Sequence, residues 1–355
     1  MRIGIAFDLA PTDPALRSEG PDDRFEEFDK PETVEAIAEV IRSEGHDVVL
    51  LGDGRDFLTR VLADPPDFVF NIAEGEGVGR CREARVPAVL EMLGIPYSGS
   101  DPLALSASLD KRMAKRLVLS ATDVRCPRGW TLPGDLAENS EGILTLLFDE
   151  SDPVGRRGGS ETPPPLILKP AFEGSSKGIR GRCIASTAEE AIEVYRALAR
   201  DYHQPILAEE FIAGDEVTVG LIGNNSSLQS GNSFVIGSMR IVPKKPDDQF
   251  VYSVEVKRDW RNRVSYEAPA DLPDPVVAAL TIAALDVSAA LQCRDLARVD
   301  FRVRDGVPYF IEANPLPGLA PVTSDLVILA EGHGIGYPDL IRRILHASLT
   351  RVGLK

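Results

Sequence analysis

Several features that mark large classes of protein are missing from this sequence. The 355 residues include only four cysteines, none of them in a CxxC pair, so we expect neither a zinc site nor a disulfide framework. No apolar run is long enough to span a bilayer, and acidic residues follow the N-terminal strand closely, so we expect no membrane span and no signal peptide. The expected location is therefore the cytoplasm, without a membrane partner.

Positive charge and phosphate-loop motifs are scarce as well. The 39 Lys and Arg residues are outnumbered by 55 Asp and Glu, and the formal net charge of −16 argues against a nucleic-acid partner. The pattern G-x-x-x-x-G-K-[ST] does not occur. Any phosphate site must therefore be a local basic pocket in an acidic protein, whose hydrophobic content of 43% is ordinary for a globular chain.

The first hundred residues alternate short apolar strands with helical patterns. Strands are predicted at "RIGIAF", "DVVLLG" and "DFVFNIAEG", and a helix is predicted at "PETVEAIAEVIRSEGH", with Val34, Ile37, Val40 and Ile41 on one face. This alternation predicts an α/β domain over residues 1–101 with a parallel, Rossmann-like sheet.

Two further domains are predicted in the rest of the chain. The first covers residues 102–208, opens with one long helix in "DPLALSASLDKRMAKRLVLSATDVRCP", and contains a loop insertion at 133–165 that is rich in Gly, Pro, Ser and acids. The second covers residues 209–355. The predicted fold class is therefore α/β with α+β regions, arranged in three domains.

The stretch "ILKPAFEGSSKGI", residues 167–179, joins an apolar strand to a loop of small polar residues. Lys169 ends the strand, and burying its ammonium group is costly unless an anion lies nearby. The loop offers the hydroxyls of Ser175 and Ser176 together with bare backbone N–H groups, which suit phosphate oxygens. A solvated surface turn is the alternative, because most Gly/Ser clusters are such turns.

The strongest pattern is "ARVDFRVRDGVPYFIEANPLPG", residues 297–318, where an Asp-Gly turn predicts a β-hairpin. Because side chains alternate along a strand, Arg298 and Asp300 share one face, and so do Glu312 and Asn314. If the register aligns these faces, three oxygen donors and one guanidinium converge, and Mg²⁺ prefers such oxygens. The alternative is an edge hairpin with solvated charges, but the apolar residues between these positions favour the metal site.

The stretch "LAEEFIAGDEVTVGLIG" connects two strands through acidic residues. Glu209, Phe211 and Ile212 could present a carboxylate and backbone groups to a heterocycle, and Glu216, after the Gly turn, could bind a ribose diol. A solvated linker between domains explains the same residues equally well. The local pattern therefore leaves a nucleotide site and a linker open.

Other charges give weaker indications. Lys111 lies in a helical pattern and Lys257 in "YSVEVKRDW", and a helical lysine is usually solvated. Glu74 and Glu76 directly follow the third predicted strand, and ligands of open α/β sheets bind at the carboxyl ends of the strands. The two glutamates are therefore candidate substrate contacts, with an acidic surface loop as the equal alternative.

Four stretches, in this order, resemble the D-alanine–D-alanine ligase family of the ATP-grasp superfamily: "GIPYSGSDPLALSASLDK", "ILKPAFEGSSKGI", "EEFIAGDEVTV" and "RVDFRVRDGVPYFIEANPLPG". The resemblance covers nearly the whole chain. It implies a three-domain ATP-grasp fold, ATP and two Mg²⁺ ions as cofactors with Mn²⁺ as a substitute, and amino acids or peptides as small-molecule substrates. A homodimer is compatible with it.

The resemblance also implies roles for individual residues. Those that would bind the nucleotide are Lys111, Lys169, Ser176 and Lys257 at the phosphates, Glu209, Phe211 and Ile212 at the adenine, and Glu216 at the ribose. Those that would bind metal are Asp300, Glu312, which would bridge the two ions, and Asn314. Arg298 and the backbone N–H of Gly318 would face the oxyanion of the tetrahedral intermediate. Ser175 would lie near the first substrate, in a loop that closes over the nucleotide.

The amino-acid sites depart from the family. The stretch "AFDLAPTDPALRSEG" lacks the glutamate that holds the first amino acid's ammonium group, Glu74 replaces a histidine, and Arg258 replaces a tyrosine. The Ser-Leu pair that binds the second carboxylate becomes Thr323 and Ser324. We therefore expect a more charged pocket than one built for alanine, unless Glu74 and Arg258 pair with each other and leave a small neutral pocket.

The activity that the resemblance implies is ATP-dependent, ADP-forming ligation of a carboxylate to an amine. The carboxylate attacks the γ-phosphoryl group to give an acyl phosphate, and the amine then displaces phosphate. Because the amino-acid sites are altered, ligation of a different amino acid or of a peptide is an alternative. A non-catalytic nucleotide-binding regulator ranks lower, because it would not need the metal residues to be kept together. A carboxylate kinase also ranks lower, because it needs no amine site and the acidic loop suits an amine.

Overall fold

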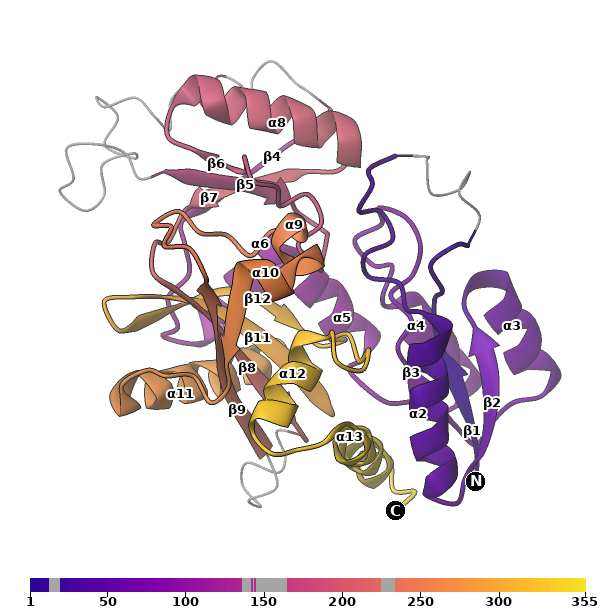
Figure 1. Ribbon diagram of the computed structural model, residues 1–355. Coiled ribbons are helices and arrows are strands. Elements are labelled where there is room, and N and C mark those ends of the chain that lie inside the picture. Colours follow the sequence, from indigo (N-terminus) through magenta and orange to yellow (C-terminus); the bar gives the residue numbers. More distant parts are fainter. Residues whose placement is uncertain (13–19, 136–141, 143, 145–164, 225–233) are drawn as a thin grey trace.

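The computed structural model describes residues 1–355 apart from 13–19, 136–141, 143, 145–164 and 225–233, so most of the predicted insertion at 133–165 lies outside the described residues. The described strands form three sheets, each with helices packed against it (Figure 1). None of the helices in the described part of the chain combines the length and the apolar character that crossing a bilayer requires.

The N-terminal sheet is parallel, as the alternation of strands and helices predicted. Its order is β2-β1-β3, with β1 at Arg2–Ala6, β2 at Asp47–Gly52 and β3 at Phe68–Asn71. The helices beside it are α2 (Pro31–Ser43), α3 (Gly54–Ala63) and α4 (Arg85–Leu93). The predicted apolar face of α2 is buried, and this burial stabilises the helix on the sheet.

The four-stranded sheet is antiparallel and has the order β4-β7-β5-β6. Its strands are β4 (Gly129–Leu132), β5 (Leu166–Pro170), β6 (Ile184–Ala185) and β7 (Ile206–Glu210). Helix α8 (Ala188–Tyr202) packs on it through the fully buried Tyr195, and the Thr187 hydroxyl caps the start of this helix. The domain boundary predicted between residues 208 and 209 falls inside β7.

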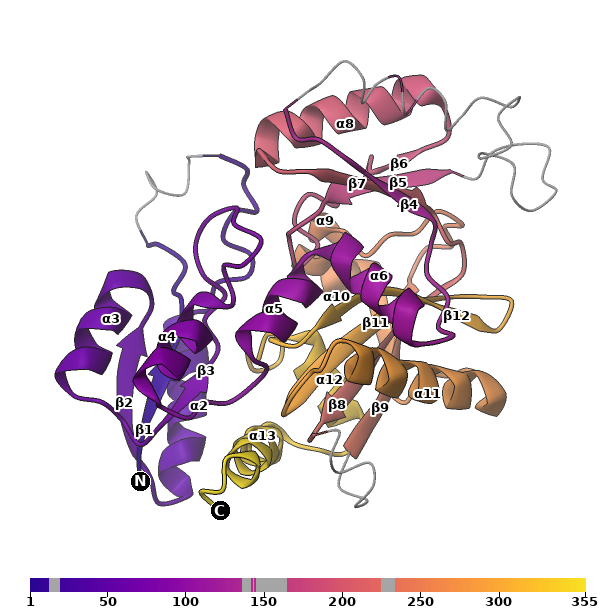
Figure 2. The same cartoon turned by 180° about the vertical axis from the view of Figure 1, so that it is seen from behind.

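The prediction of one long helix after residue 102 is wrong, because the chain forms two helices there, α5 (Pro102–Leu109) and α6 (Lys111–Ala121). Asp110 separates them, and its carboxylate accepts hydrogen bonds from the backbone N–H groups of Arg112 and Met113. These N–H groups have no partner within the helix, so an Asp at this position favours a new helix start. Figure 2 shows α5 and α6 passing from the N-terminal unit across the five-stranded sheet.

The five-stranded sheet is antiparallel and has the order β10-β9-β8-β11-β12. Its strands are β8 (Asp215–Ile222), β9 (Phe234–Pro243), β10 (Val264–Glu267), β11 (Leu296–Arg304) and β12 (Val307–Asn314). The helices of this region are α9 (Val254–Arg258), α10 (Trp260–Arg263), α11 (Asp274–Ala290), α12 (Asp325–Gly332) and α13 (Tyr337–Arg351). Helices α11 and α12 pack on opposite faces of the sheet, so both faces are covered.

The N-terminal and C-terminal regions share one apolar core. Ile37 and Ile41 of α2 belong to the same buried cluster as Ile341 and Leu345 of α13. At the rim of this contact, Arg342 Nε donates to Glu44 Oε1 at 2.7 Å. These contacts fix the N-terminal unit beside the larger sheets, and the loops after β1 and β3 thereby reach the ends of β11 and β12 (Figure 1).

Candidate active site

The hairpin of β11 and β12 has a register that brings the predicted metal residues together. Asp300 lies opposite Glu312, and Arg298 lies opposite Asn314. The Asp300 carboxylate accepts hydrogen bonds from Arg298 Nε at 3.0 Å, from Asn314 Nδ2 at 3.2 Å and from Thr218 Oγ1 of β8 at 2.6 Å. The four polar side chains of the hairpin therefore converge on one face.

Two lysines compensate the charge of Glu312. Lys111 Nζ, at the start of α6, donates to Glu312 Oε2 at 2.7 Å, and the charge of Lys169 is also close. Burial alone would raise the pKa of Glu312, but the charges of Lys111, Lys169 and Arg298 outweigh burial and hold that pKa well below its usual range. Glu312 is therefore an anion in a basic setting that also suits phosphate.

Asp300, Glu312 and Asn314 offer two carboxylates and an amide. Among the described residues, no three or more His, Cys, Asp and Glu side chains come together as a self-sufficient metal site. The hairpin set nevertheless fits Mg²⁺, which proteins commonly hold with one or two carboxylates while phosphate and water fill the other positions. It lacks the Cys and His ligands that softer metals prefer.

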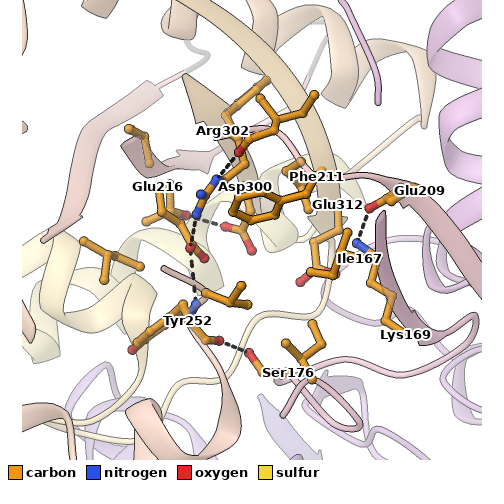
Figure 3. A pocket seen from close by; sticks show the side chains of 18 of the residues that line it. Ile167, Lys169, Ser176, Glu209, Phe211, Glu216, Tyr252, Asp300, Arg302 and Glu312 are labelled. Carbon is orange, nitrogen blue, oxygen red and sulfur yellow. Dashed lines mark hydrogen bonds and ion pairs between the residues drawn. The ribbon is translucent and has the colours of Figure 1, made fainter. Parts of the chain in front are cut away.

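A pocket with about 770 Å³ of empty space, which includes space open to solvent, lies between the four-stranded and five-stranded sheets and is called the first pocket below (Figure 3). Apolar side chains form part of its wall, namely Ile167, Phe211, Ile212, Val217, Ile241 and Phe301. Charged side chains form the rest, including Lys169, Lys257, Arg298 and Glu312. An apolar slot that ends in cations suits a ligand with a flat heterocycle and an anionic tail.

Glu209 binds two buried lysines at this pocket. Lys169 Nζ lies 2.5 Å from Glu209 Oε1, Lys115 Nζ lies 3.1 Å from Glu209 Oε2, and all three side chains are at most 2% exposed. Burial lowers the pKa of Lys115 to about 8, although the Glu209 charge opposes this shift. The sequence pattern did not single out Lys115; its available signal was the four-residue spacing from Lys111, which places both lysines on one face of α6.

Glu216 is oriented by Arg302, another residue that the sequence pattern did not single out. Arg302 Nη1 donates to Glu216 Oε2 at 2.9 Å, and Arg302 Nε donates to the backbone oxygen of Ile212 at 2.9 Å. The same guanidinium lies 5.0 Å from the centre of the Phe211 ring. One cation thus fixes three of the predicted nucleotide residues, as Figure 3 shows for Glu216 and Phe211.

The remaining predicted nucleotide contacts, Ser176 and Lys257, also line the first pocket. The Ser176 hydroxyl donates to the backbone oxygen of Tyr252 at 2.7 Å, and Lys257 Nζ lies 5.0 Å from the centre of the Tyr252 ring. Asp325, at the start of α12, lies 3.9 Å from Lys257 Nζ and 3.3 Å from Arg298 Nη1. This carboxylate was not predicted, and it holds both cations at the pocket.

A second pocket adjoins the first, with about 500 Å³ of empty space that includes space open to solvent, and both pockets are lined by Arg298 and Glu312. The other walls of the second pocket come from the N-terminal unit, the start of α6, the loop after β5 and the end of β12. They include the predicted residues Ser175, Gly318 and Glu74. A ligand in the second pocket would therefore lie beside the cationic end of the first pocket.

A buried ion network ties the N-terminal unit to the loop after β5. Glu27 Oε2 lies 2.9 Å from Arg82 Nη2 and 2.8 Å from Lys177 Nζ, and Glu173 contacts the same two cations. Burial would raise the pKa of Glu27, but the charges of Lys177 and Arg82 lower it to about 2. The backbone N–H of Gly174 also donates to Glu27 Oε1 at 2.7 Å. The loop is thus held more firmly than its small residues suggested.

Glu27 is a further residue of the N-terminal unit that the sequence pattern did not single out. It lines the second pocket, although the stretch compared with the family's Gly-rich loop ends at Gly20. The sequence "DDRFEEFDK" contains five acidic residues, and nothing in their spacing marks Glu27 as the one that lines the second pocket. The feature that could have indicated Glu27 is its position in the chain, because it lies just before α2 begins at Pro31.

Arg258 does not pair with Glu74. Its guanidinium contacts Asp22 Oδ2 at 2.6 Å and Glu26 Oε1 at 2.6 Å, and within the described residues it lines neither of the two pockets. The physical reason is helical geometry, because Lys257 and Arg258 are neighbours on α9 and neighbouring side chains point about 100° apart. Lys257 faces the first pocket and Arg258 therefore faces the loop after β1.

The other three predicted substrate contacts also lie off the two pockets as the described residues define them. Glu76 is exposed and pairs with Arg24 at 3.0 Å. Thr323 is exposed, and the Ser324 hydroxyl accepts a hydrogen bond from the backbone N–H of Ala320 at 2.9 Å. The Ser324 hydroxyl thus stabilises the turn before α12. The next residue, Asp325, is the one that contacts Arg298.

Comparisons with known proteins agree on one family. The family model described as "D-ala D-ala ligase C-terminus" matches residues 157–346. The D-alanine–D-alanine ligase of Moorella thermoacetica is 30% identical over 319 residues, which cover 88% of this chain and 92% of the relative.

Two solved structures show the same fold over almost the whole chain. The D-alanine–D-alanine ligase of Bacillus anthracis complexed with ATP matches with a TM-score of 0.67 and 21% identity, covering 100% of this chain and 99% of that one. The VanG D-Ala:D-Ser ligase of Enterococcus faecalis matches with a TM-score of 0.69 and 18% identity, covering 98% and 99% of the two chains.

Proposed function

Since this chain belongs to the D-alanine–D-alanine ligase family, we propose that it is an ATP-dependent, ADP-forming carboxylate–amine ligase. The observation that carries the proposal is that the first and second pockets share Arg298 and Glu312. A terminal phosphate bound at these residues would lie beside a carboxylate held in the second pocket. Such closeness is what transfer of a phosphoryl group to a carboxylate requires.

ATP would contact the residues that the family resemblance assigned to the nucleotide. They line the first pocket, except for Lys111, which lines the second. The adenine would lie against Phe211 and Ile212, and the ribose would hydrogen-bond Glu216, which Arg302 holds in place. The residues assigned to the phosphates are Lys111, Lys169, Lys257 and Ser176. Arg302 and Lys115 act on the site by orienting Glu216 and Glu209, so we assign them positioning roles.

Magnesium would be held by Asp300, Glu312 and Asn314, and it would neutralise charge on the transferring phosphoryl group. Lys111 and Arg298 already bind these carboxylates, so both cations stay within reach of the phosphate oxygens. The hairpin fixes the orientation of the Arg298 guanidinium, and the start of α6 fixes that of the Lys111 ammonium group. Such preorganised donors stabilise the charge that develops in the transition state.

The chemistry has two steps. A substrate carboxylate oxygen attacks the γ-phosphorus, the P–O bond to ADP breaks, and an acyl phosphate forms. An amine nitrogen then attacks the acyl carbon, the C–O bond to phosphate breaks, and the nitrogen loses a proton to solvent. Arg298 and the backbone N–H of Gly318 lie at the second pocket, where they would stabilise the tetrahedral oxyanion between these events.

The loop after β5 would protect the acyl phosphate from water. Glu173, Gly174 and Ser175 form part of the wall of the second pocket, and Ser176 lines the first. Arg82 and Lys177 hold this loop in place through the buried ion network. A closed wall that excludes water suits a reactive intermediate that hydrolysis would destroy.

We expect product formation to require both ATP and Mg²⁺ and to yield ADP and phosphate. The measurement is nucleotide analysis after incubation of the purified protein with a panel of amino acids and dipeptides, with mass detection of ligated products. The reason is that the cations surround the place where a γ-phosphoryl group would be transferred. AMP and pyrophosphate as products would contradict the mechanism.

D-alanine is the first substrate to test, because the relatives' names state that activity. A different amino acid is the second candidate. It is favoured by the carboxylates of Glu74 and Glu83, both of which line the second pocket. A small neutral pocket of the kind suited to alanine would require those charges to be paired with protein cations.

A further inference from the structure

Glu74 and Glu83 are carboxylates of the second pocket that form no direct hydrogen bond or ion pair with the described residues. Both lie between β3 and α4 and line the pocket wall. Glu83 is only 7% exposed, and within the described part of the chain neither carboxylate takes part in a hydrogen bond or an ion pair. A buried anion without a partner is costly. Its presence on a pocket wall therefore indicates a cationic ligand.

The other acids of the second pocket are compensated by protein cations. In the buried ion network, Glu27 and Glu173 each contact both Arg82 and Lys177. At the hairpin, Glu312 contacts Lys111. Two anions thus face two cations in the buried network, and one faces one at the hairpin. The carboxylates of Glu74 and Glu83 are therefore left without a protein cation of their own in this count.

Burial and the charges of neighbouring carboxylates keep these two carboxyls from ionising together. Burial raises the pKa of Glu83 to about 8. Burial, followed by the nearby charge of Glu83, raises the pKa of Glu74 well above its usual range. A bound cation would favour the ionised forms and release a proton.

We propose that Glu74 and Glu83 bind the two positive charges of a basic amino acid, whose carboxylate is activated at the Arg298 end of the second pocket. This inference rests on the proposed ligase function. Two anions match a substrate with an α-ammonium group and a side-chain cation one for one, whereas an alanine-like substrate would leave one buried anion unpaired. A shared proton between the two carboxyls, with no cation bound, is the outcome that the experiments below must exclude.

Lysine and two analogues of it test the two positive charges of the substrate one at a time. Norleucine replaces the side-chain ammonium group of lysine by a methyl group, and 6-aminohexanoic acid lacks the α-ammonium group. Both enantiomers of lysine and norleucine are supplied with ATP, Mg²⁺ and a mixture of acceptor amino acids, and ADP release and products are measured. We expect kcat/KM for one lysine enantiomer to exceed the values for the other two compounds by about tenfold or more.

Two variants test whether Glu83 is responsible. Glu83→Gln removes one charge at nearly constant size, and we expect it to raise the KM for lysine about tenfold while bringing lysine and norleucine near parity. Glu39→Gln, which removes an exposed carboxylate on α2, is the control and should leave both substrates unchanged. Equal use of lysine and norleucine by the wild type, unaltered in Glu83→Gln, would overturn the cation site and leave the ligase function standing.

Calorimetry tests binding without turnover. Lysine and norleucine are titrated at pH 7 into the protein with Mg²⁺ and a non-hydrolysable ATP analogue, in two buffers of different ionisation enthalpy. We expect lysine to release about one proton, norleucine fewer, and Glu83→Gln to remove the difference. The charged groups that act on Glu83 in this titration are Glu74, Glu27, Arg82, Lys111 and Lys177.

The two proposals fail in different ways. No lysine binding, or the same proton release with lysine and norleucine, would contradict the basic amino-acid site whatever the turnover. Lysine binding with proton release, but without ADP formation from any substrate, would support the cation site and count against the ligase function.

Discussion

Replacing Glu312 by glutamine is expected to lower kcat by about 10²- to 10³-fold while the protein stays folded. Glu312 lies opposite Asp300 and is common to both pockets, so its charge lies where phosphate and metal would meet. Glutamine keeps the size of the side chain, and its amide oxygen can still accept from Lys111 Nζ. The change therefore removes the charge and leaves the packing intact.

The measurement is the rate of ADP release at saturating ATP over a series of Mg²⁺ concentrations, with thermal unfolding recorded in parallel. Glu331→Gln, at an exposed position near the end of α12, is the matched control and should behave as wild type. A near-normal rate for Glu312→Gln at saturating Mg²⁺ would rule out the proposed metal site.

Replacing Arg82 by methionine should lower the free energy of unfolding by about 3–5 kcal/mol. The Arg82 side chain is 1% exposed, and it donates to Glu27 and to the backbone oxygen of Phe172. Methionine fills a similar length without charge, so Glu27 and Glu173 would lose half of the positive charge that compensates them. Two buried anions facing one cation account for the size of the loss.

Urea unfolding of wild type and variant measures this change. Arg42→Met is the control, because Arg42 pairs with Glu35 at the surface, where both side chains are about half exposed, and its loss should cost about 0–1 kcal/mol. If both variants lose the same small amount, the buried network does not hold the charges as described.

The same network should respond to acid in a defined direction. Burial opposes ionisation of Glu27, but the charges of Lys177 and Arg82 outweigh it and lower the pKa to about 2. A lowered pKa in the folded state stabilises the fold above the unfolded value of about 4.3, and this contribution is lost as the pH falls toward 2. The gap in stability between wild type and Arg82→Met should therefore be constant from pH 7 to pH 5 and narrow below it.

The sequence predicted those parts of the site that depend on local periodicity. Alternation along a strand placed Asp300 with Arg298, and Glu312 with Asn314, and the Asp-Gly turn set the hairpin whose register joins the two pairs. The break between α5 and α6 was also local, and Asp110 followed by a basic helix start was a readable signal that the long-helix prediction overlooked.

Contacts between distant segments could not be predicted in this way. Glu27 meets Arg82, 55 residues away, and Lys177, 150 residues away, only because α13 and α2 pack the N-terminal unit beside the larger sheets. Thr323 and Ser324, which the resemblance assigned to a substrate carboxylate, lie off the two pockets for a related reason. The position where α12 starts decides which side chain faces Arg298, and no periodic pattern in the preceding turn fixes that position.

The buried ion network has a consequence for the timing of the catalytic cycle. Glu27 and Arg82 belong to the N-terminal unit, whereas Glu173 and Lys177 belong to the loop that covers the second pocket. If that loop moves away from the N-terminal unit, all four charges must separate and become hydrated together. A partly open loop would therefore have lost the ion pairs without full hydration of the charges. We therefore expect opening to be an all-or-none event, and the release of a finished product to wait for it even when bond formation is fast.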